Sequence, residues 1–149
     1  MKSNSSINRA ALGTTVLRVI TGLIFVAHGA AKLFVFTPAG TAAFFALAGI
    51  PFAAAAAPLV IATEMGGGLL LLFGLLTRWA ALPLAATMVV AILTVHLKAG
   101  FFLPDGYEFA LIMLASTLSL ALQGSGAVAL DNLRGRRRSI QPIEAARAA

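Results

Sequence analysis

The chain of 149 residues contains no cysteine. This excludes disulfide bonds, cysteine-held iron–sulfur clusters, covalently attached c-type haem and a cysteine nucleophile. Charged residues are also scarce, at 11% of the sequence, whereas 60% is hydrophobic. Soluble domains average about 25% charged residues. The composition therefore indicates an integral membrane protein, with no room for a separate soluble catalytic domain.

Four apolar windows are long enough to cross a bilayer, since roughly 20 apolar residues span its core as a helix. They lie near residues 12–34, 52–76, 79–97 and 107–123. We therefore predict one all-α domain over residues 1–149, a four-helix transmembrane bundle. Between the first two windows, Thr37-Pro38 is typical of a helix start and Gly49-Ile50-Pro51 of a stop. This predicts a short helix in the first outer loop, either interfacial or re-entrant.

The net charge of +6 follows the positive-inside pattern rather than the pattern of a nucleic-acid-binding protein. Lys2 and Arg9 precede the first window, and Arg78 falls in an expected two-residue turn between the second and third. A basic tail, 124–149, contains the arginines at 134 and 136–138. We predict a multi-pass protein of the bacterial cytoplasmic (inner) membrane, with both termini cytoplasmic and the lipid bilayer as its main partner.

One carboxyl group, Glu64, lies near the middle of the second window and is followed by Gly66-Gly67-Gly68. A carboxyl at this depth is costly unless it is paired, protonated or facing a cavity, and such groups are often functional. Gly68 lies one helical turn from Glu64. Its missing side chain leaves space for a neighbouring helix or a ligand.

The first window carries further ionisable groups. At 100° per residue, Arg18 and Lys32 share a stripe with Gly22, Phe25 and Gly29, and His28 lies on its flank. Glycines on this stripe allow another helix to approach closely. The charged residues should therefore face protein rather than lipid.

Depth decides which of these groups can meet. At 1.5 Å per residue, His28 lies roughly 8 Å outward of the middle of its span and Lys32 roughly 14 Å. His96 lies roughly 12 Å outward in the third span, and Glu108 opens the fourth near the outer boundary. We therefore expect His28, Lys32, His96 and Glu108 to form one cluster in the outer half. Glu64 would reach this cluster through His28 or would meet Arg18.

The motifs together resemble the DoxX family of small four-helix bacterial membrane proteins. The matching pieces are Leu17-Arg18 to Gly22, His28-Gly29-Ala30-Ala31-Lys32-Leu33, Phe44-Phe45 before Gly49-Ile50-Pro51, Glu64-Met65-Gly66-Gly67-Gly68, Gly74 to Arg78, His96, Asp105-Gly106-Tyr107-Glu108 and Leu130-Asp131. The resemblance implies a membrane oxidoreductase subunit. Family members include a small subunit associated with thiosulfate:quinone oxidoreductase and proteins linked to quinone or oxidative stress. No defined catalytic residue set comes with the family.

From these groups we predict a quinone site in a membrane oxidoreductase system. Glu64, His28 and Lys32 would be the catalytic groups: Glu64 would move protons, and His28 and Lys32, together with His96, would orient the quinone head. His96, Glu108, Arg18, Phe25 and Gly68 would line the site. Electrons would come from a bound quinone or from a partner, such as a redox protein or a larger oxidoreductase subunit, because the chain shows no redox cofactor of its own. A homo-oligomer is also compatible with the sequence.

Other functions remain open at this stage. The polar cluster could be structural, in a non-enzymatic anchor or scaffold for a redox or stress-response complex. A midplane charge and a glycine-broken helix are also features of transporters, although four spans would need to oligomerise. Two histidines are the minimum for haem ligation, and nothing else supports haem. A metal site could use His28, His96, Glu64 and Glu108, whose ligand types suit zinc or copper, but their spacing carries no signature. We predict neither.

Overall fold

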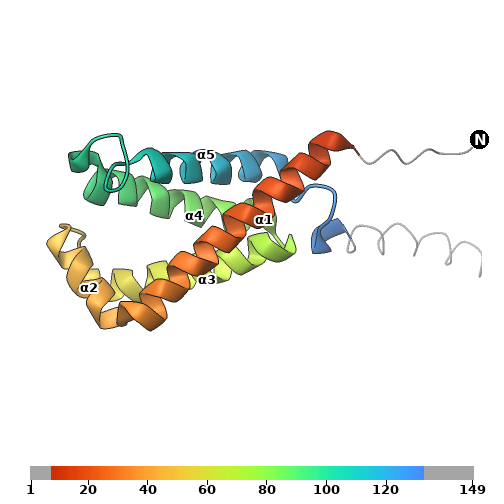
Figure 1. Cartoon of the computed structure of the whole chain (residues 1–149). Coiled ribbons are helices and arrows are strands. Elements are labelled where there is room, and N and C mark those ends of the chain that lie inside the picture. The colour runs from red at the N-terminus through yellow and green to blue at the C-terminus, as the bar shows by residue number, and fades with distance from the viewer. Residues whose placement is uncertain (1–7, 133–149) are drawn as a thin grey trace, which may run out of the picture.

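The computed structural model describes residues 8–132, and these residues form helices and no strands (Figure 1). The helices are α1 (Arg9–Ala30), α2 (Thr37–Leu47), α3 (Ala53–Phe73), α4 (Thr77–Ala91) and α5 (Glu108–Gln123). A π-helical turn, η1 (Ala31–Val35), extends α1; η2 (Ile92–His96), also π-helical, and a 3₁₀ turn, η3 (Leu97–Ala99), extend α4. The prediction of an all-α four-helix bundle with a short additional helix is confirmed.

Helices α1 and α3 cross in close contact because small residues line the crossing (Figure 1). A β-carbon at Gly22 would lie 2.8 Å from the carbonyl oxygen of Gly68, and one at Gly29 would lie 2.6 Å from Cγ of Met65. No side chain fits at these distances. The predicted glycine stripe is therefore the contact surface between the two helices.

Helices α4 and α5 run side by side in opposite directions and complete the bundle (Figure 1). Leu84 of α4 fills the space beside Gly67 of α3, and it is fully buried. Together with Phe25, Leu71 and Leu120 it belongs to a continuous apolar core. The second glycine of the triplet, Gly67, thus allows α4 to pack closely against α3, whereas the third, Gly68, allows α1 to do so.

Three helical segments are long and apolar enough to cross a membrane: Arg9–Val35, Ala53–Phe73 and Thr77–Ala99. Helix α5 has 16 residues, which corresponds to roughly 24 Å. It is shorter than the other three because residues 100–107 form a folded loop, closed by hydrogen bonds from Tyr107 N–H to the Gly100 carbonyl and from Glu108 N–H to the Phe101 carbonyl.

The turn between α3 and α4 differs from the prediction. We expected it at Arg78-Trp79, but α3 ends earlier, at Phe73, and Arg78 already lies in α4. Gly74 has a φ of 66°, a left-handed conformation that glycine adopts without steric cost. Gly74 therefore stops α3 three residues before the end of the apolar run.

Helix α2 follows its predicted signals. The Thr37 hydroxyl accepts a hydrogen bond from Gly40 N–H at 3.2 Å, as a capping side chain does, and the helix ends before Gly49. Helix α2 packs against α3 at the end of the bundle opposite the termini (Figure 1). We call this end, with α2 and the 97–107 segment, the cavity end, and the end with Arg9 and residues 124–132 the terminal end.

Candidate ligand-binding cavity

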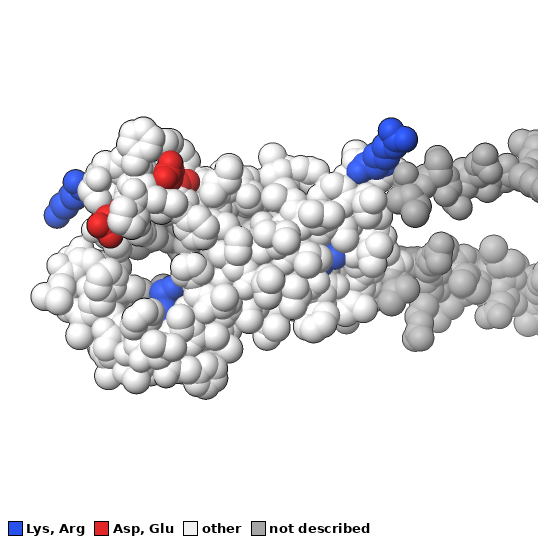
Figure 2. Space-filling model, viewed as in Figure 1, with Lys and Arg blue, Asp and Glu red and all other residues white. Residues whose placement is uncertain are grey.

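A cavity of about 700 Å³ opens at the cavity end of the bundle. All five α-helices contribute to its wall, through residues such as Phe25, Phe45, Glu64, Thr87 and Phe109. Figure 2 shows the molecule hollowed at this end, with a basic side chain inside the hollow. Sites for small molecules usually measure about 300–1,000 Å³ and are mostly apolar with a few placed polar groups. The cavity matches both properties.

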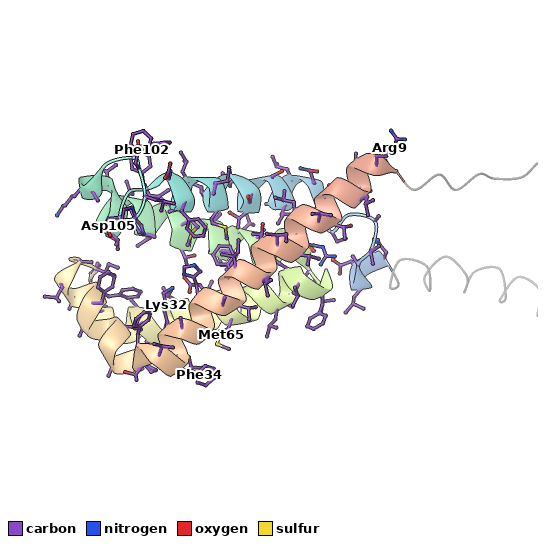
Figure 3. All side chains as sticks on the ribbon, in the orientation of Figure 1. Arg9, Lys32, Phe34, Met65, Phe102 and Asp105 are labelled. Carbon is purple, nitrogen blue, oxygen red and sulfur yellow. The ribbon has the colours of Figure 1, made fainter. Side chains whose placement is uncertain are left out.

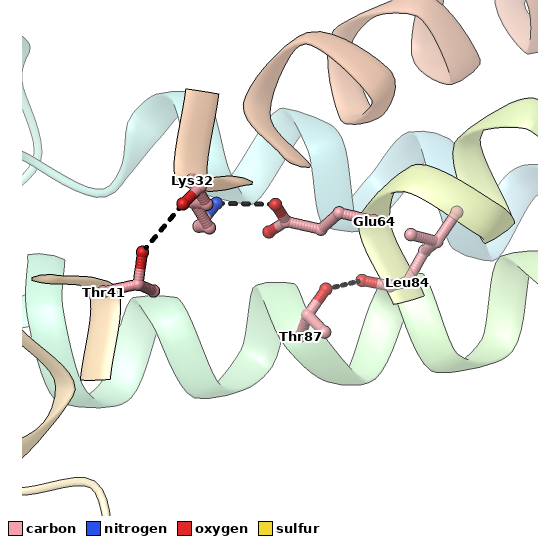
Figure 4. A network of polar contacts seen from close by, with 5 residues as sticks. All are labelled: Lys32, Thr41, Glu64, Leu84 and Thr87. Atoms are coloured by element: carbon pink, nitrogen blue, oxygen red, sulfur yellow. Dashed lines mark hydrogen bonds and ion pairs between the residues drawn. The ribbon is translucent and has the colours of Figure 1, made fainter. Parts of the chain in front are cut away.

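An ion pair lies in this cavity. Nζ of Lys32 donates to a carboxylate oxygen of Glu64 at 2.6 Å (Figure 4), and the two side chains are 22% and 4% exposed. In residues 8–132 it is the one salt bridge that forms. Lys32 is labelled in Figure 3 on the inner side of the bundle, whereas Phe34, two residues on, points outward. Glu64 therefore pairs directly with Lys32, not through His28 or with Arg18 as the depth estimates suggested.

Two polar residues of the cavity lie on π-helical turns. Lys32 belongs to η1, and His96 is the last residue of η2. π-Helical turns within α-helices are rare and frequently occur at functional sites. The Thr41 hydroxyl of α2 donates to the Lys32 carbonyl at 3.3 Å, which ties α2 to this turn (Figure 4).

Both histidines line the cavity and are held by neighbours. The His28 ring stacks on Phe109 of α5, with the ring centroids 5.8 Å apart. Nδ1 of His96 lies 2.8 Å from the carbonyl oxygen of Asp105 in the outer loop. The structure thus brings His28, Lys32, Glu64 and His96 to one cavity from three different helical segments.

The rest of the wall is apolar and rich in aromatic side chains. Phe25 is buried at 1% exposure, and Phe44 and Phe45 of α2 also line the cavity. Aromatic faces of this kind stack with planar rings. The cavity can therefore hold a planar apolar ring with polar substituents against the charged and imidazole groups.

Three residues that we assigned to the site lie elsewhere. Arg18 is at the terminal end, where it donates to the backbone carbonyls of Leu71, Leu72, Ser125 and Val128. Glu108 accepts a hydrogen bond from Leu103 N–H at 2.8 Å and stabilises the outer loop. Gly68 contacts Gly22 and Val26 in the α1–α3 crossing. Glu108 is therefore not part of the expected cluster in the outer half. Gly68 makes room for the neighbouring helix α1 rather than for a ligand.

Phe109 and Thr87 are among the cavity residues that sequence reasoning missed. Phe109 directly follows Glu108, and its stacking on His28 depends on how α5 packs against α1. Thr87 is a hydroxyl in an otherwise apolar run, and its oxygen donates to the Leu84 carbonyl at 2.8 Å (Figure 4). A polar residue inside a span was the available signal for Thr87.

The fold and its interior define the class of this protein: an integral membrane helical bundle that encloses a mostly apolar cavity and an internal ion pair. The profile of the DoxX family matches residues 13–97, which include His28, Lys32, Glu64 and His96. The chain belongs to the DoxX family.

Similar proteins support the same assignment. The chain is 42% identical to "Putative oxidoreductase CatD" of Bacillus subtilis over 120 residues, 80% of this chain and 85% of that protein. It is 31% identical to "Inner membrane protein YqjF" of Escherichia coli over 131 residues, 85% of this chain and 95% of that protein. An uncharacterized membrane protein of Mycobacterium tuberculosis is 34% identical over 132 residues, 81% of this chain and 80% of that protein. No solved structure matches the chain.

Proposed function

We propose that this protein binds a quinone in the cavity, as a subunit or small component of a membrane oxidoreductase system. The observation that carries the proposal is the Lys32–Glu64 ion pair on the wall of an apolar cavity of about 700 Å³. A quinone supplies two-electron chemistry coupled to two protons when it is bound. The residues of this chain would hold its head group and exchange its protons.

The shape and lining of the cavity suit such a molecule. The head group of a quinone is a planar ring with two polar oxygens, and its tail is apolar. Phe25, Phe44, Phe45 and Phe109 offer faces to a ring. Exposed apolar residues on the outer surfaces of the helices, such as Leu23 and Leu93, would face the lipid in which an apolar tail would lie.

The polar groups divide the tasks of binding and proton transfer. Lys32 uses one of its three N–H donors on Glu64 and keeps two for a ligand oxygen. Glu64 is buried and accepts from Lys32, so a proton can pass between the two within one hydrogen bond. His28 and His96 offer imidazole nitrogens, which can donate or accept hydrogen bonds.

The membrane context follows from the same proposal. The basic residues at the terminal end favour cytoplasmic termini by the positive-inside rule, and one similar protein is named an inner membrane protein. Another is named a putative oxidoreductase, which accords with a redox role. Electrons would come from a partner redox protein, with this chain as the lipid-embedded quinone-binding part.

The test is the quinone content of the purified protein, measured by mass spectrometry of organic extracts. Ala86 lines the cavity on α4, and Ala86→Phe would place a phenyl ring in the cavity and keep both members of the ion pair. Ala62 is exposed on α3 outside the cavity wall, so Ala62→Phe is the matched control. We expect near-stoichiometric quinone in the wild type and in Ala62→Phe, and quinone only at the level of bulk lipid in Ala86→Phe. Equal carry-over levels in all three would favour a scaffold with a structural ion pair.

A further inference from the structure

The cavity extends into the seam between α3 and α4. The two helices touch where Leu84 of α4 packs on Gly67 of α3, with Cγ of Leu84 3.0 Å from the position of a β-carbon at Gly67. From this contact toward the cavity end the two helices diverge (Figure 1). Val60 and Thr63 of α3 and Thr87 of α4 line the cavity in this part, so the cavity separates the two helices there.

The edge of this seam is apolar and reaches the outer surface of the bundle. Leu59 of α3 is 68% exposed and Val90 of α4 is 45% exposed, and both line the cavity. Side chains exposed to this degree lie on the surface, so these two residues belong both to the cavity wall and to the lipid-facing surface. Ala86 and Pro83, one and two helical turns before Val90, are also exposed and line the cavity. We call Leu59, Pro83, Ala86 and Val90 the rim.

The side of the cavity formed by α1 and α5 is different. The His28 ring of α1 stacks on Phe109 of α5 and so bridges these two helices. Lys32 of η1, which extends α1, pairs with the Glu64 carboxylate, and His96 is held by a backbone carbonyl of the outer loop. The ionisable groups of the cavity thus lie away from the rim, and no rim residue is ionisable.

This arrangement orients a ligand that has a polar head and an apolar chain. The head would lie by Lys32 and Glu64, because a buried polar group needs hydrogen-bond partners. The chain would leave across the rim, whose side chains are apolar. We propose that the seam between α3 and α4 is the lipid-facing entrance of the cavity, and that the ligand is a long-tailed quinone dissolved in the bilayer rather than a short water-soluble one. This deepens the proposed function and rests on it.

A tail in this entrance gains little affinity from the hydrophobic effect. Lipid chains are as apolar as the rim, so moving a tail from lipid to the rim changes its free energy little. The entrance matters because it gives the tail a place while the head is bound. A cavity closed to lipid would bind the bare ring and exclude the tailed one. The deciding quantity is therefore the affinity for the tailed quinone divided by the affinity for the bare ring.

The test uses two probes, 2-methyl-1,4-naphthoquinone and the same ring with a tail of four prenyl units. The full-length protein is reconstituted in nanodiscs, and quinone is quantified by mass spectrometry of organic extracts. Bound quinone is the excess over empty nanodiscs of the same lipid composition, and free quinone is its mole fraction in the lipid. We expect the wild type to bind both probes with similar affinity, which gives a ratio near one.

Variants of the rim show whether the tail uses this seam. Leu59→Trp and Val90→Trp would each place an indole ring in the entrance. We expect the ratio to fall about tenfold, which corresponds to about 1.4 kcal/mol, because overpacking of the seam opposes the tail. Affinity for the bare ring should stay unchanged, as expected for an intact cavity. Leu69→Trp and Val89→Trp are matched controls, because Leu69 and Val89 are 40% and 41% exposed on the same two helices and lie outside the cavity wall.

The outcomes separate the two claims. If the wild type binds the bare ring but not the tailed quinone, the lipid-facing entrance is overturned and the quinone site stands. If the two rim variants lower the ratio no more than the two controls do, the assignment to the seam between α3 and α4 is overturned. If the wild type binds neither probe above the level of empty nanodiscs, the proposed function itself fails.

Discussion

Helix α1 and its π-helical extension carry two inward-facing cations with opposite surroundings. Arg18, at the terminal end, is 2% exposed and is surrounded by backbone carbonyls of α3 and of residues 125–128. Lys32, at the cavity end, is 22% exposed and pairs with a single carboxylate. The hydrogen-bond partners of Arg18 are backbone carbonyls of the fold itself, whereas Lys32 keeps donors that face a cavity. A charge inside a membrane bundle can therefore be structural or available to a ligand, and its partners distinguish the two.

The two ends of the bundle differ in the same way. At the terminal end, Asp131 N–H donates to the Gly74 carbonyl and the Asp131 carboxylate accepts from Leu76 N–H, so the segment after α5 is tied to the α3–α4 turn. At the cavity end, α2 and the outer loop surround a space of about 700 Å³. We therefore expect substitutions at the terminal end to affect stability, and substitutions at the cavity end to affect ligand binding.

The largest expected effect is on stability, from Arg18→Met. The change removes hydrogen bonds from a charged donor to four carbonyls. Such bonds contribute about 1.5–3 kcal/mol each, so we expect a loss of at least about 3 kcal/mol in the free energy of unfolding. The midpoint of thermal unfolding in detergent measures it. Arg9→Met, at an exposed position, should leave the midpoint nearly unchanged. Equal midpoints of thermal unfolding for the two variants would show that Arg18 does not stabilise the fold.

A smaller loss of stability is expected from Gly22→Val. The new side chain would collide with the Gly68 carbonyl and would separate α1 from α3. Overpacking of this kind costs about 1–3 kcal/mol. Gly66→Ala is the control, because a β-carbon at Gly66 has nothing within 4 Å. The same thermal measurement should show a lower midpoint for Gly22→Val and no loss for Gly66→Ala.

The ion pair should behave differently from Arg18. Replacing both members, as Lys32→Met with Glu64→Leu, leaves no unpaired charge, and apolar replacement of a buried pair is often neutral for stability. We expect the double variant to unfold within about 1 kcal/mol of the wild type, and Glu64→Gln alone to be less stable than the double variant. A double variant that fails to fold would show that the pair holds the bundle together.

The smallest effect is expected from Thr41→Val. This change removes the 3.3 Å hydrogen bond to the Lys32 carbonyl and keeps the shape of the side chain. One neutral hydrogen bond contributes about 0.5–1.5 kcal/mol. We expect a shift at the low end of that range, with a modest weakening of ligand binding because α2 forms part of the cavity wall. A loss of stability as large as that of Arg18→Met would contradict the contrast between the two ends.

Much of the fold could be predicted from the sequence because it depends on local patterns. Apolar length indicated the spans, and Thr37-Pro38 and Gly49 bounded α2. The spacing of Gly22 and Gly29 indicated the helix-packing face. Of the cavity groups, His28, Lys32, Glu64 and His96 were each identified, because an ionisable group inside an apolar run is conspicuous.

The partners of these groups could not be predicted. The depth estimates assumed regular α-helices and ignored the length of the side chains. They therefore placed Lys32 too far from Glu64 for the two to pair. A π-helical turn and the long lysine side chain join them. The structural role of Arg18 could not be predicted, and Arg18 was therefore assigned to the site. Its partners are backbone carbonyls more than 50 residues away in sequence, and no pattern of side chains indicates them.

The most direct test of the central claim is the amount of quinone that copurifies with the Lys32→Met, Glu64→Leu double variant. The wild type and an Arg9→Met control are measured beside it by mass spectrometry of organic extracts. The account predicts about one quinone per chain in the wild type and the control, and only lipid carry-over in a double variant that is as stable as the wild type. Equal quinone in a stable double variant and the wild type would contradict a ligand-binding role for the ion pair.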